Sequence, residues 1–325
     1  MRRWPLTRRS VGTLVPVAVA IAALAAATLV VFRDRDQLSE SIRRLGWPTV
    51  GLSFALAVAG VFFIALLWRA VLTGLGAPTE FRAACAMFFI SQLGKYLPGS
   101  LWPVVSQMEF GRRHCIARRT MLAANVITLA LSLTVALILA AALLPFSSPD
   151  ALGRFWWTFL LLPPLVACVH PRALPAVLDA LFRVFKREPL NQRVTGRSVV
   201  AAVSWSGLSW VVLGLHLYVI THALGAHGPA GLAAAIGGVT FGVAVGIVVI
   251  PAPAGIGVRD VALGAVLTPG LGATNAIAAA LASRILLVGA DVVLAVLSVL
   301  ARAGFGPTPD TESIPGPRGV HETEL

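Results

Sequence analysis

The sequence predicts an all-α membrane protein that crosses the bilayer several times. Hydrophobic residues make up 57% of the 325 residues, and charged residues only 12%, about half the share found in soluble domains. Apolar runs of about 20 residues, long enough to span a bilayer, recur along the chain. The net charge of +12 comes mainly from arginines in short loops between these runs, which is typical of membrane topology. We therefore expect membrane lipids as partners and no nucleic acid.

About six spanning helices are predicted, at 13–32, 49–68, 120–144, 155–169, 198–222 and 276–301. The first follows a basic N-terminus and could be a signal peptide, but its length and the lack of a small-residue cleavage site favour an uncleaved helix. The polar, basic loop 170–197 contains a short amphipathic stretch at 175–186. The Pro/Gly-rich tail 303–325 is predicted to be disordered and cytosolic.

Two further apolar segments are interrupted by proline and glycine. The first runs over 83–97, breaks at Pro98-Gly99, and resumes at about 100–110. The second runs over 231–250, breaks within 251–257, and ends near 268. Broken backbone is tolerated in a membrane only where protein or a water-filled cavity surrounds it. We therefore predict two re-entrant broken hairpins, each of which returns to the side that it entered.

Loop charge supports this topology. If both hairpins return, the loops on one side carry 18 lysines and arginines and those on the other side carry 5. Single crossings would instead place the basic loops 111–119 and 170–197 on the outer side. For the topology with two hairpins, the positive-inside rule places both termini in the cytosol. The composition, rich in Ala, Arg, Gly and Pro and poor in Lys, suggests a bacterium, so the predicted location is the bacterial inner (plasma) membrane.

The two interrupted segments also indicate an inverted repeat. Residues 49–145 and 198–302 each consist of a span, a broken hairpin and a span, and the predicted sidedness makes the second unit run opposite to the first. Together with the first helix they form one predicted transmembrane domain, 1–302. Paired interrupted helices in inverted halves indicate a transporter site near the bilayer midplane.

Few ionisable residues fall within the apolar segments, and burying any of them alone would be costly. We therefore expect them to pair or to contact a polar ligand. Arg259 and Asp260 open the half-helix after the second break, where free N–H groups favour an anion. The predicted substrate-binding residues are Gln92, Lys95, Tyr96, Pro98, Gly99, Pro253, Gly255, Gly257, Arg259, Asp260, Arg284 and Asp291.

These charges have two interpretations. In the functional one, Lys95, Arg259 and Arg284 meet an anionic head group, with Gln92 and Asn125 donating hydrogen bonds beside it. The acids Glu109, Asp260 and Asp291 then orient the cations or carry protons. In the structural one, the same residues form ion pairs or extend to the membrane surface. Arg284 and Asp291 are seven residues apart and so share one helix face.

Motifs for other chemistry are absent. No Walker A pattern and no Asp-x-Asp pair occurs, and the serines Ser204, Ser206 and Ser209 have no partner that would activate them. The three cysteines are far apart and the histidines are scattered, so the sequence predicts no metal site and no cofactor. We expect no enzyme activity and identify no catalytic residue.

Two stretches carry a resemblance to a known family. "GKYLPGSLWP" (94–103) resembles the Lys-Tyr-hydrophobic-Pro-Gly motif of the lysylphosphatidylglycerol synthase transmembrane region family, also called flippase-like membrane proteins. "PAPAGIGVRD" (251–260) and "ASRILLVGADVVLAVL" (282–297) resemble its second signature. The resemblance covers about 13–302. The chain departs from the family at Asp260, where Glu is usual, and in "NVITLALS" (125–132), where relatives often carry an Arg/Asp-like pair.

The resemblance implies two re-entrant hairpins and a lipid flippase or transporter for an anionic or polar head group, either an aminoacyl-phospholipid or a polyprenyl lipid or glycolipid. In multiple peptide resistance factors a cytosolic aminoacyl-transferase domain follows this region. Only 24 residues follow Ala301 here, so we do not expect the synthase chemistry. Two alternatives stay open: a membrane-embedded or accessory subunit of a lipid-linked glycosyl or aminoacyl transferase, with a glycosyltransferase or lipid-modifying enzyme as partner, and a scaffold that recruits a partner through 170–197 or the tail.

Overall fold

The computed structural model describes residues 40, 43, 45–96, 102–148, 150–169, 195–248 and 257–303. Within these residues all regular structure is helical, as predicted, with ten α-helices and three short 3-10 helices. Several predicted features lie outside the described residues: the span 13–32, the amphipathic stretch 175–186, the tail from 304 onward, and the break residues Pro98, Gly99, Pro253 and Gly255.

Five of the described helices are long and apolar enough to cross a membrane, which makes this a multi-pass membrane protein. They are α3 (Trp47–Gly74), α6 (Arg118–Leu143), α10 (Gly196–Ala223), α11 (Gly228–Val248) and α13 (Ala273–Ala303). Four match the predicted spans 49–68, 120–144, 198–222 and 276–301. The fifth, α11, covers the segment that we predicted as one arm of a hairpin, and its 21 residues are long enough to cross alone.

The predicted span at 155–169 does not form one long helix. The chain there forms α7 (Ala151–Phe155), a 3-10 helix η3 (Trp156–Leu161) and α8 (Leu162–Val169). Pro163 and Pro164 lie in the first turn of α8, a position that tolerates proline although a helix interior does not. The apolar helical stretch Trp156–Cys168 is shorter than a bilayer requires.

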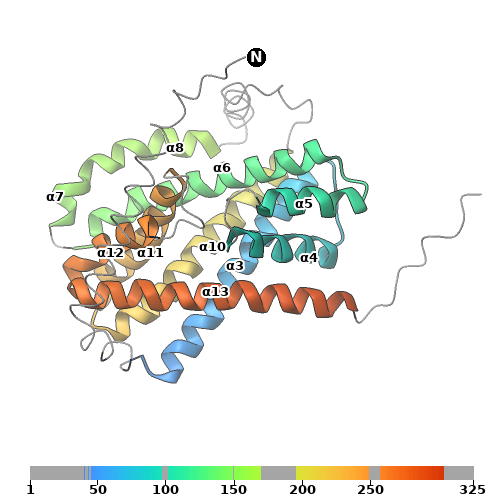
Figure 1. Cartoon of the computed structure of the whole chain (residues 1–325). Coiled ribbons are helices and arrows are strands. Elements are labelled where there is room, and N and C mark those ends of the chain that lie inside the picture. The colour runs from blue at the N-terminus through green and yellow to red at the C-terminus, as the bar shows by residue number, and fades with distance from the viewer. Residues whose placement is uncertain are drawn as a thin grey trace, which may run out of the picture.

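The centre of the bundle is the antiparallel pair α3 and α10, which lie side by side in Figure 1. Small residues allow this close approach, as is common between membrane helices. A Cβ atom added at Gly60 of α3 would lie 2.6 Å from the Leu213 side chain of α10. Ser209 of α10 donates a hydrogen bond to the Gly60 carbonyl at 2.8 Å. The pair therefore forms a fixed core on which the other helices assemble.

Two helix pairs pack on this core. The first consists of α4 (Phe81–Gln92), continued by the 3-10 helix η1 (Leu93–Tyr96), and α5 (Trp102–Arg113); α4 and α5 lie beside each other in Figure 1. The second consists of α11 and α12 (Val258–Leu271). Each pair also contacts a long helix from the other part of the chain: α4 contacts α13, and α11 contacts α6. The division into repeat halves 49–145 and 198–302 stays a prediction.

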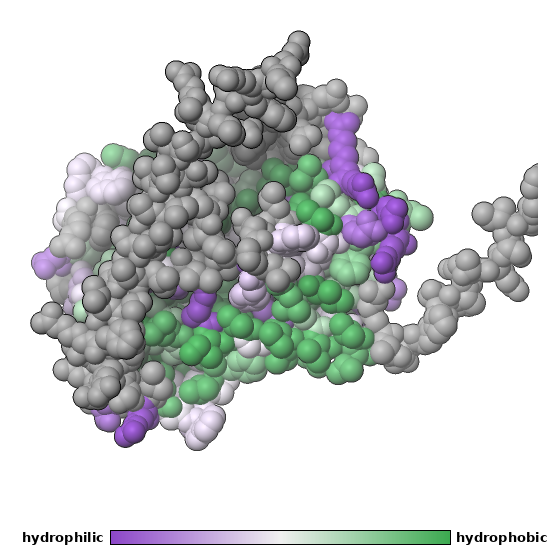
Figure 2. Space-filling view, viewed as in Figure 1, coloured by the Kyte–Doolittle hydropathy of each residue, from purple (hydrophilic) through white to green (hydrophobic). Residues whose placement is uncertain are grey.

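The surface is apolar where a membrane protein meets lipid. Figure 2 shows a hydrophobic surface along the lower part of the view, where Figure 1 places α13. Side chains of α13 such as Ile285, Leu297 and Leu300 are largely exposed. A soluble monomer rarely exposes so continuous an apolar face. Hydrophilic side chains gather instead at the right of the view, over the ends of α5 and α6.

Candidate functional site

A cavity of about 210 Å³ lies where the two helix pairs meet the central helices. Three cationic side chains and one carboxylate line it, within the described part of the chain, together with a tyrosine and apolar residues of α3, α10, α11 and α13. The polar lining residues are Lys95, Tyr96, Arg259, Arg284 and Asp291. Residues almost 200 positions apart thus meet in one place, and five of the predicted substrate-binding residues are among them.

Asp291 is the centre of this group. It is only 2% exposed, and its Oδ2 atom contacts Lys95 Nζ at 2.6 Å and accepts a hydrogen bond from the Tyr96 hydroxyl at 2.5 Å. Hydrogen bonds that involve charged groups are short and strong. Lys95 and Tyr96 belong to η1, so these contacts fix the end of the first helix pair to α13.

The second carboxylate oxygen of Asp291 is different. Oδ1 is buried and has no hydrogen-bond partner among the described residues. Leaving a buried acceptor without a donor costs about 1–3 kcal/mol, and more for a charged group. Asp291 also lines the cavity, so this acceptor without a donor lies beside the space that a ligand could occupy.

Asp260 has a structural role at the start of α12. Its Oδ2 accepts a hydrogen bond from the Gly257 N–H at 3.2 Å, and its Oδ1 lies 3.7 Å from an Arg284 nitrogen. Gly257 adopts φ +87°, which favours glycine because it has no Cβ. A carboxylate in the first turn also complements the helix dipole. Part of the predicted anion site at this helix end is therefore occupied by the chain's own acid.

Arg259 is the half-buried cation beside this cap. It lines the cavity and makes no ion pair and no side-chain hydrogen bond within the described ranges. Glycine on α11 brings the two helices together here, since a Cβ at Gly242 would lie 3.0 Å from the Arg259 carbonyl oxygen. Arg259 therefore presents a guanidinium group to the cavity with its donors available.

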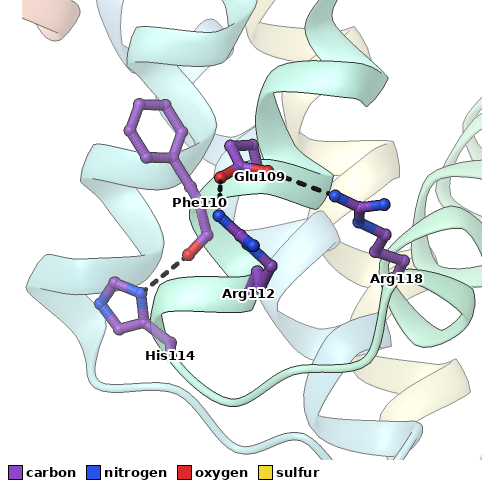
Figure 3. Close-up of polar contacts among 5 residues, drawn as sticks. All are labelled: Glu109, Phe110, Arg112, His114 and Arg118. Atoms are coloured by element: carbon purple, nitrogen blue, oxygen red, sulfur yellow. Dashed lines mark hydrogen bonds and ion pairs between the residues drawn. The ribbon is translucent and has the colours of Figure 1, made fainter.

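Glu109 belongs to a different cluster (Figure 3) and is not among the residues that line the cavity. Its carboxylate contacts Arg112 at 2.7 Å and Arg118 at 3.5 Å, and it is 44% exposed. The hydrogen bond from Arg112 lowers the pKa of Glu109 below its usual range. Nearby, His114 Nδ1 lies 3.1 Å from the Phe110 carbonyl oxygen. The structure thus separates Glu109 from the other two acids that we predicted as proton carriers.

Two other predicted polar residues lie outside the cavity lining. Gln92 is half-buried at the end of α4 and does not line the cavity. Asn125 donates to the Met121 carbonyl of its own helix at 2.9 Å. Neither residue shows a contact with the charged group around Asp291 in the described part of the chain.

Sequence reasoning missed Trp210, which forms part of the cavity wall. Its indole N–H donates to the Ser132 carbonyl at 3.0 Å, which fixes α10 to α6. No sequence signal distinguished this tryptophan from other aromatic residues in apolar runs.

Sequence reasoning also missed a neutral polar cluster on the core. His216 is fully buried, with Nδ1 2.7 Å from Ser53 Oγ and Nε2 2.9 Å from Ser283 Oγ. The cluster joins α10 to α3 and α13. Six histidines scattered along the sequence gave no indication of it.

The fold and the cavity together define a class: a multi-pass, all-helical membrane protein that gathers charged side chains in one cavity. Comparison with family models identifies the family within this class. Residues 15–295 match the family described as the lysylphosphatidylglycerol synthase TM region, and the chain belongs to that family, as the two sequence signatures predicted. No curated protein and no solved structure matches the chain.

Proposed function

We propose that this protein is a lipid flippase or transporter that binds the polar head group of an anionic or zwitterionic lipid in the cavity. The observation that carries the proposal is Arg259, a cation with available donors beside Arg284 and Lys95 in an otherwise largely apolar cavity. A cation in apolar surroundings is costly without an anionic partner. Membership of the lysylphosphatidylglycerol synthase TM region family supports the same function.

The phosphate of the head group binds the arginine side chains in this proposal. A guanidinium group presents a planar fork of donors that fits phosphate oxygens. Arg259 and Arg284 both line the cavity, and Arg284 also lies near Asp260. Since Asp260 already accepts the Gly257 N–H, the arginine side chains are better placed for the phosphate than the end of helix α12.

Asp291 adds selectivity for a second group. Its buried Oδ1 lacks a donor among the described residues, and it shares the cavity with the cations. A head group that carries both a phosphate and a hydroxyl or ammonium group satisfies both features. Aminoacyl-phospholipids, phosphatidylglycerol and lipid-linked sugars have this combination, whereas phosphatidic acid has no hydroxyl or ammonium group apart from its phosphate.

Lys95 couples binding to movement in this proposal. Its ammonium group contacts Asp291 and lines the cavity that the phosphate enters. A phosphate that attracts Lys95, or a proton on Asp291, weakens the contact that fixes η1 to α13. A ligand can shift a conformational equilibrium only through such differential contacts. Asp260 is the second acid that we propose as a proton carrier, because it lies beside Arg284.

The transport geometry completes the proposal. Two hairpins enter from opposite faces of the bacterial inner membrane, and both termini are cytosolic. Three observations support this arrangement: the loop charges, the reciprocal contacts of α4 with α13 and of α11 with α6, and the antiparallel pair α3 and α10. The cavity then lies where the two halves meet, as in transporters built from inverted repeats.

Reconstitution tests the proposal. The full chain is placed in vesicles with labelled lipids of four classes: aminoacylated phosphatidylglycerol, phosphatidylglycerol, phosphatidylethanolamine and uncharged diacylglycerol. We expect the protein to accelerate movement of the phosphate-containing lipids above the rate in empty vesicles, and to leave the spontaneous movement of diacylglycerol unchanged. Arg259→Ala should slow movement at least tenfold, whereas Arg112→Ala, a surface control, should not. Rates equal to those of empty vesicles for all four classes would refute the proposal.

The accessory role in a lipid-linked transferase stays an alternative prediction. Its reactive acid would be Glu109 or Asp260. Glu109 contacts Arg112 and Arg118 and Asp260 is held by Gly257 and Arg284, so the structure gives neither acid particular support. Product formation from a radiolabelled lipid donor that depends on the protein and is lost in Asp260→Asn would support this alternative.

A further inference from the structure

Two exposed histidines face each other at the joint between α10 and α11, outside the charged cavity. His222 lies in the last turn of α10, and His227 directly precedes α11. Their Nδ1 atoms are 3.1 Å apart, and the rings meet edge to face with centroids 4.5 Å apart. The scattered histidines of the sequence gave no indication of this pair, and His216, on the same helix as His222, is fully buried.

The connection between the helices holds both rings in place. Gly225 and Gly228 adopt φ values of +112° and +72°, a region that glycine occupies readily. The Ala226 N–H donates to the Thr221 carbonyl at 2.9 Å, a bond typical of a capped helix end. On its other side, the His222 ring lies 5.5 Å from the Tyr218 ring. The two nitrogens are therefore positioned by a short, hydrogen-bonded turn.

The distance between the nitrogens suits a shared metal ion. Zn²⁺ binds imidazole nitrogen at about 2.0–2.1 Å, so an ion bound to both atoms 3.1 Å apart would have an N–metal–N angle of about 95–100°. Imidazole is a preferred ligand of Zn²⁺, Cu²⁺ and Ni²⁺. We propose that His222 and His227 form a two-histidine site for a divalent transition-metal cation. Water completes the coordination, because no group of three metal ligands occurs among the described residues.

A bound cation would join the end of α10 to the start of α11. Both helices line the charged cavity, through Trp210 and Leu213 on α10 and Val243 on α11. A cation that restrains their relative movement would slow lipid movement. This consequence rests on the proposed function, whereas metal binding itself does not.

Metal binding is tested on the full chain, purified without a polyhistidine tag. Calorimetric titration with Zn²⁺ should show one site, and the Cu²⁺ electron paramagnetic resonance spectrum should show coupling to two imidazole nitrogens. His222→Ala and His227→Ala should each weaken Zn²⁺ binding at least tenfold. His114→Ala is the matched control, since His114 lies beside the Phe110 carbonyl and has no histidine neighbour in the described structure. It should leave the affinity unchanged.

Two outcomes would overturn the site: a Zn²⁺ affinity that is the same in wild type and both variants, or binding in wild type only at millimolar concentration. The vesicle assay separates this inference from the proposed function. Zn²⁺ that slows lipid movement by wild type but not by His227→Ala supports the consequence drawn above. If no lipid moves under any condition but Zn²⁺ binds as described, the proposed function fails and the metal site is retained.

Discussion

Asp291 and Glu109 each contact two partners, and the shorter ion pair of each has a similar length, but their surroundings are very different. Asp291 is 2% exposed and lies 2.6 Å from Lys95, whereas Glu109 is 44% exposed and lies 2.7 Å from Arg112. Exposed ion pairs contribute little to stability because water screens them. When one partner of a buried pair is removed, the other charge is left buried without a partner, which strongly destabilises the fold. Burial, and not the length of the ion pair, therefore determines which of the two clusters contributes more to stability.

The largest expected effect follows from removing the buried acid. Asp291→Ala leaves Lys95 and Tyr96 without their shared partner, and breaking a buried pair costs about 3–5 kcal/mol. We expect the lower end of that range, because Lys95 is itself 32% exposed. The midpoint of thermal unfolding in detergent measures the effect. If Asp291→Ala unfolds at the wild-type temperature, burial does not separate the two clusters and the comparison fails.

Replacing both partners by apolar residues sharpens the comparison. Apolar replacement of a whole buried pair is often neutral for stability. Lys95→Met combined with Asp291→Leu should therefore recover most of the stability lost in Asp291→Ala, while lipid movement in vesicles stays at the background rate. A double variant that moves lipid at the wild-type rate would show that this pair has only a structural role.

The sequence predicted much of the fold because long apolar runs determine it. The spans at α3, α6, α10 and α13 follow directly from run length. Two cases differed. Pro163-Pro164 separate α8 from the residues before it within the predicted span at 155–169. Helix α11 has 21 residues, about as many as the run 231–250 that we assigned to one arm of a hairpin, so run length did not distinguish an arm from a span. Hydropathy gives no account of where such breaks fall.

The sequence also predicted which charged residues gather, but not how they pair. The cost of burying charge singled out Lys95, Arg259, Arg284 and Asp291, and all four line the cavity. The sequence placed Arg284 and Asp291 on one helix face and left open whether Arg259 or Arg284 pairs with Asp260 or Asp291. The structure places Arg284 near Asp260, one of these options, and Lys95 against Asp291, which was not among them, because helices distant in sequence supply the partners. Such pairing depends on tertiary packing, which spacing along one helix does not determine.

We expect the neutral cluster around His216 to contribute less to stability than the cluster around Asp291 and more than the cluster around Glu109. Ser283→Ala leaves the buried Nε2 of His216 without its 2.9 Å partner, and an unsatisfied buried group costs about 1–3 kcal/mol. Ser298→Ala is a control on the same helix, since its hydroxyl donates only to the Leu294 carbonyl of its own helix. The unfolding midpoint should fall more in Ser283→Ala than in Ser298→Ala. Equal midpoints would show that the cluster does not stabilise the fold.

The smallest effect is expected at Glu109. The hydrogen bond from Arg112 lowers the pKa of Glu109 in the folded protein. This carboxylate therefore adds stability above its ordinary pKa of about 4.3, and that stability is lost as pH falls through the lowered folded value. Because Glu109 is exposed, the contribution is small and is screened by salt.

Carbon NMR of a glutamate-labelled chain measures this titration directly. Glu109 should titrate below its ordinary range, and Arg112→Ala should move its pKa back toward that range. Glu109→Gln should leave lipid movement unchanged, because the structure places this acid at the surface, apart from the cavity. If Glu109→Gln stops movement as completely as Asp291→Ala does, proton coupling lies at the surface cluster, and an exposed ion pair has a function that its small energy does not indicate.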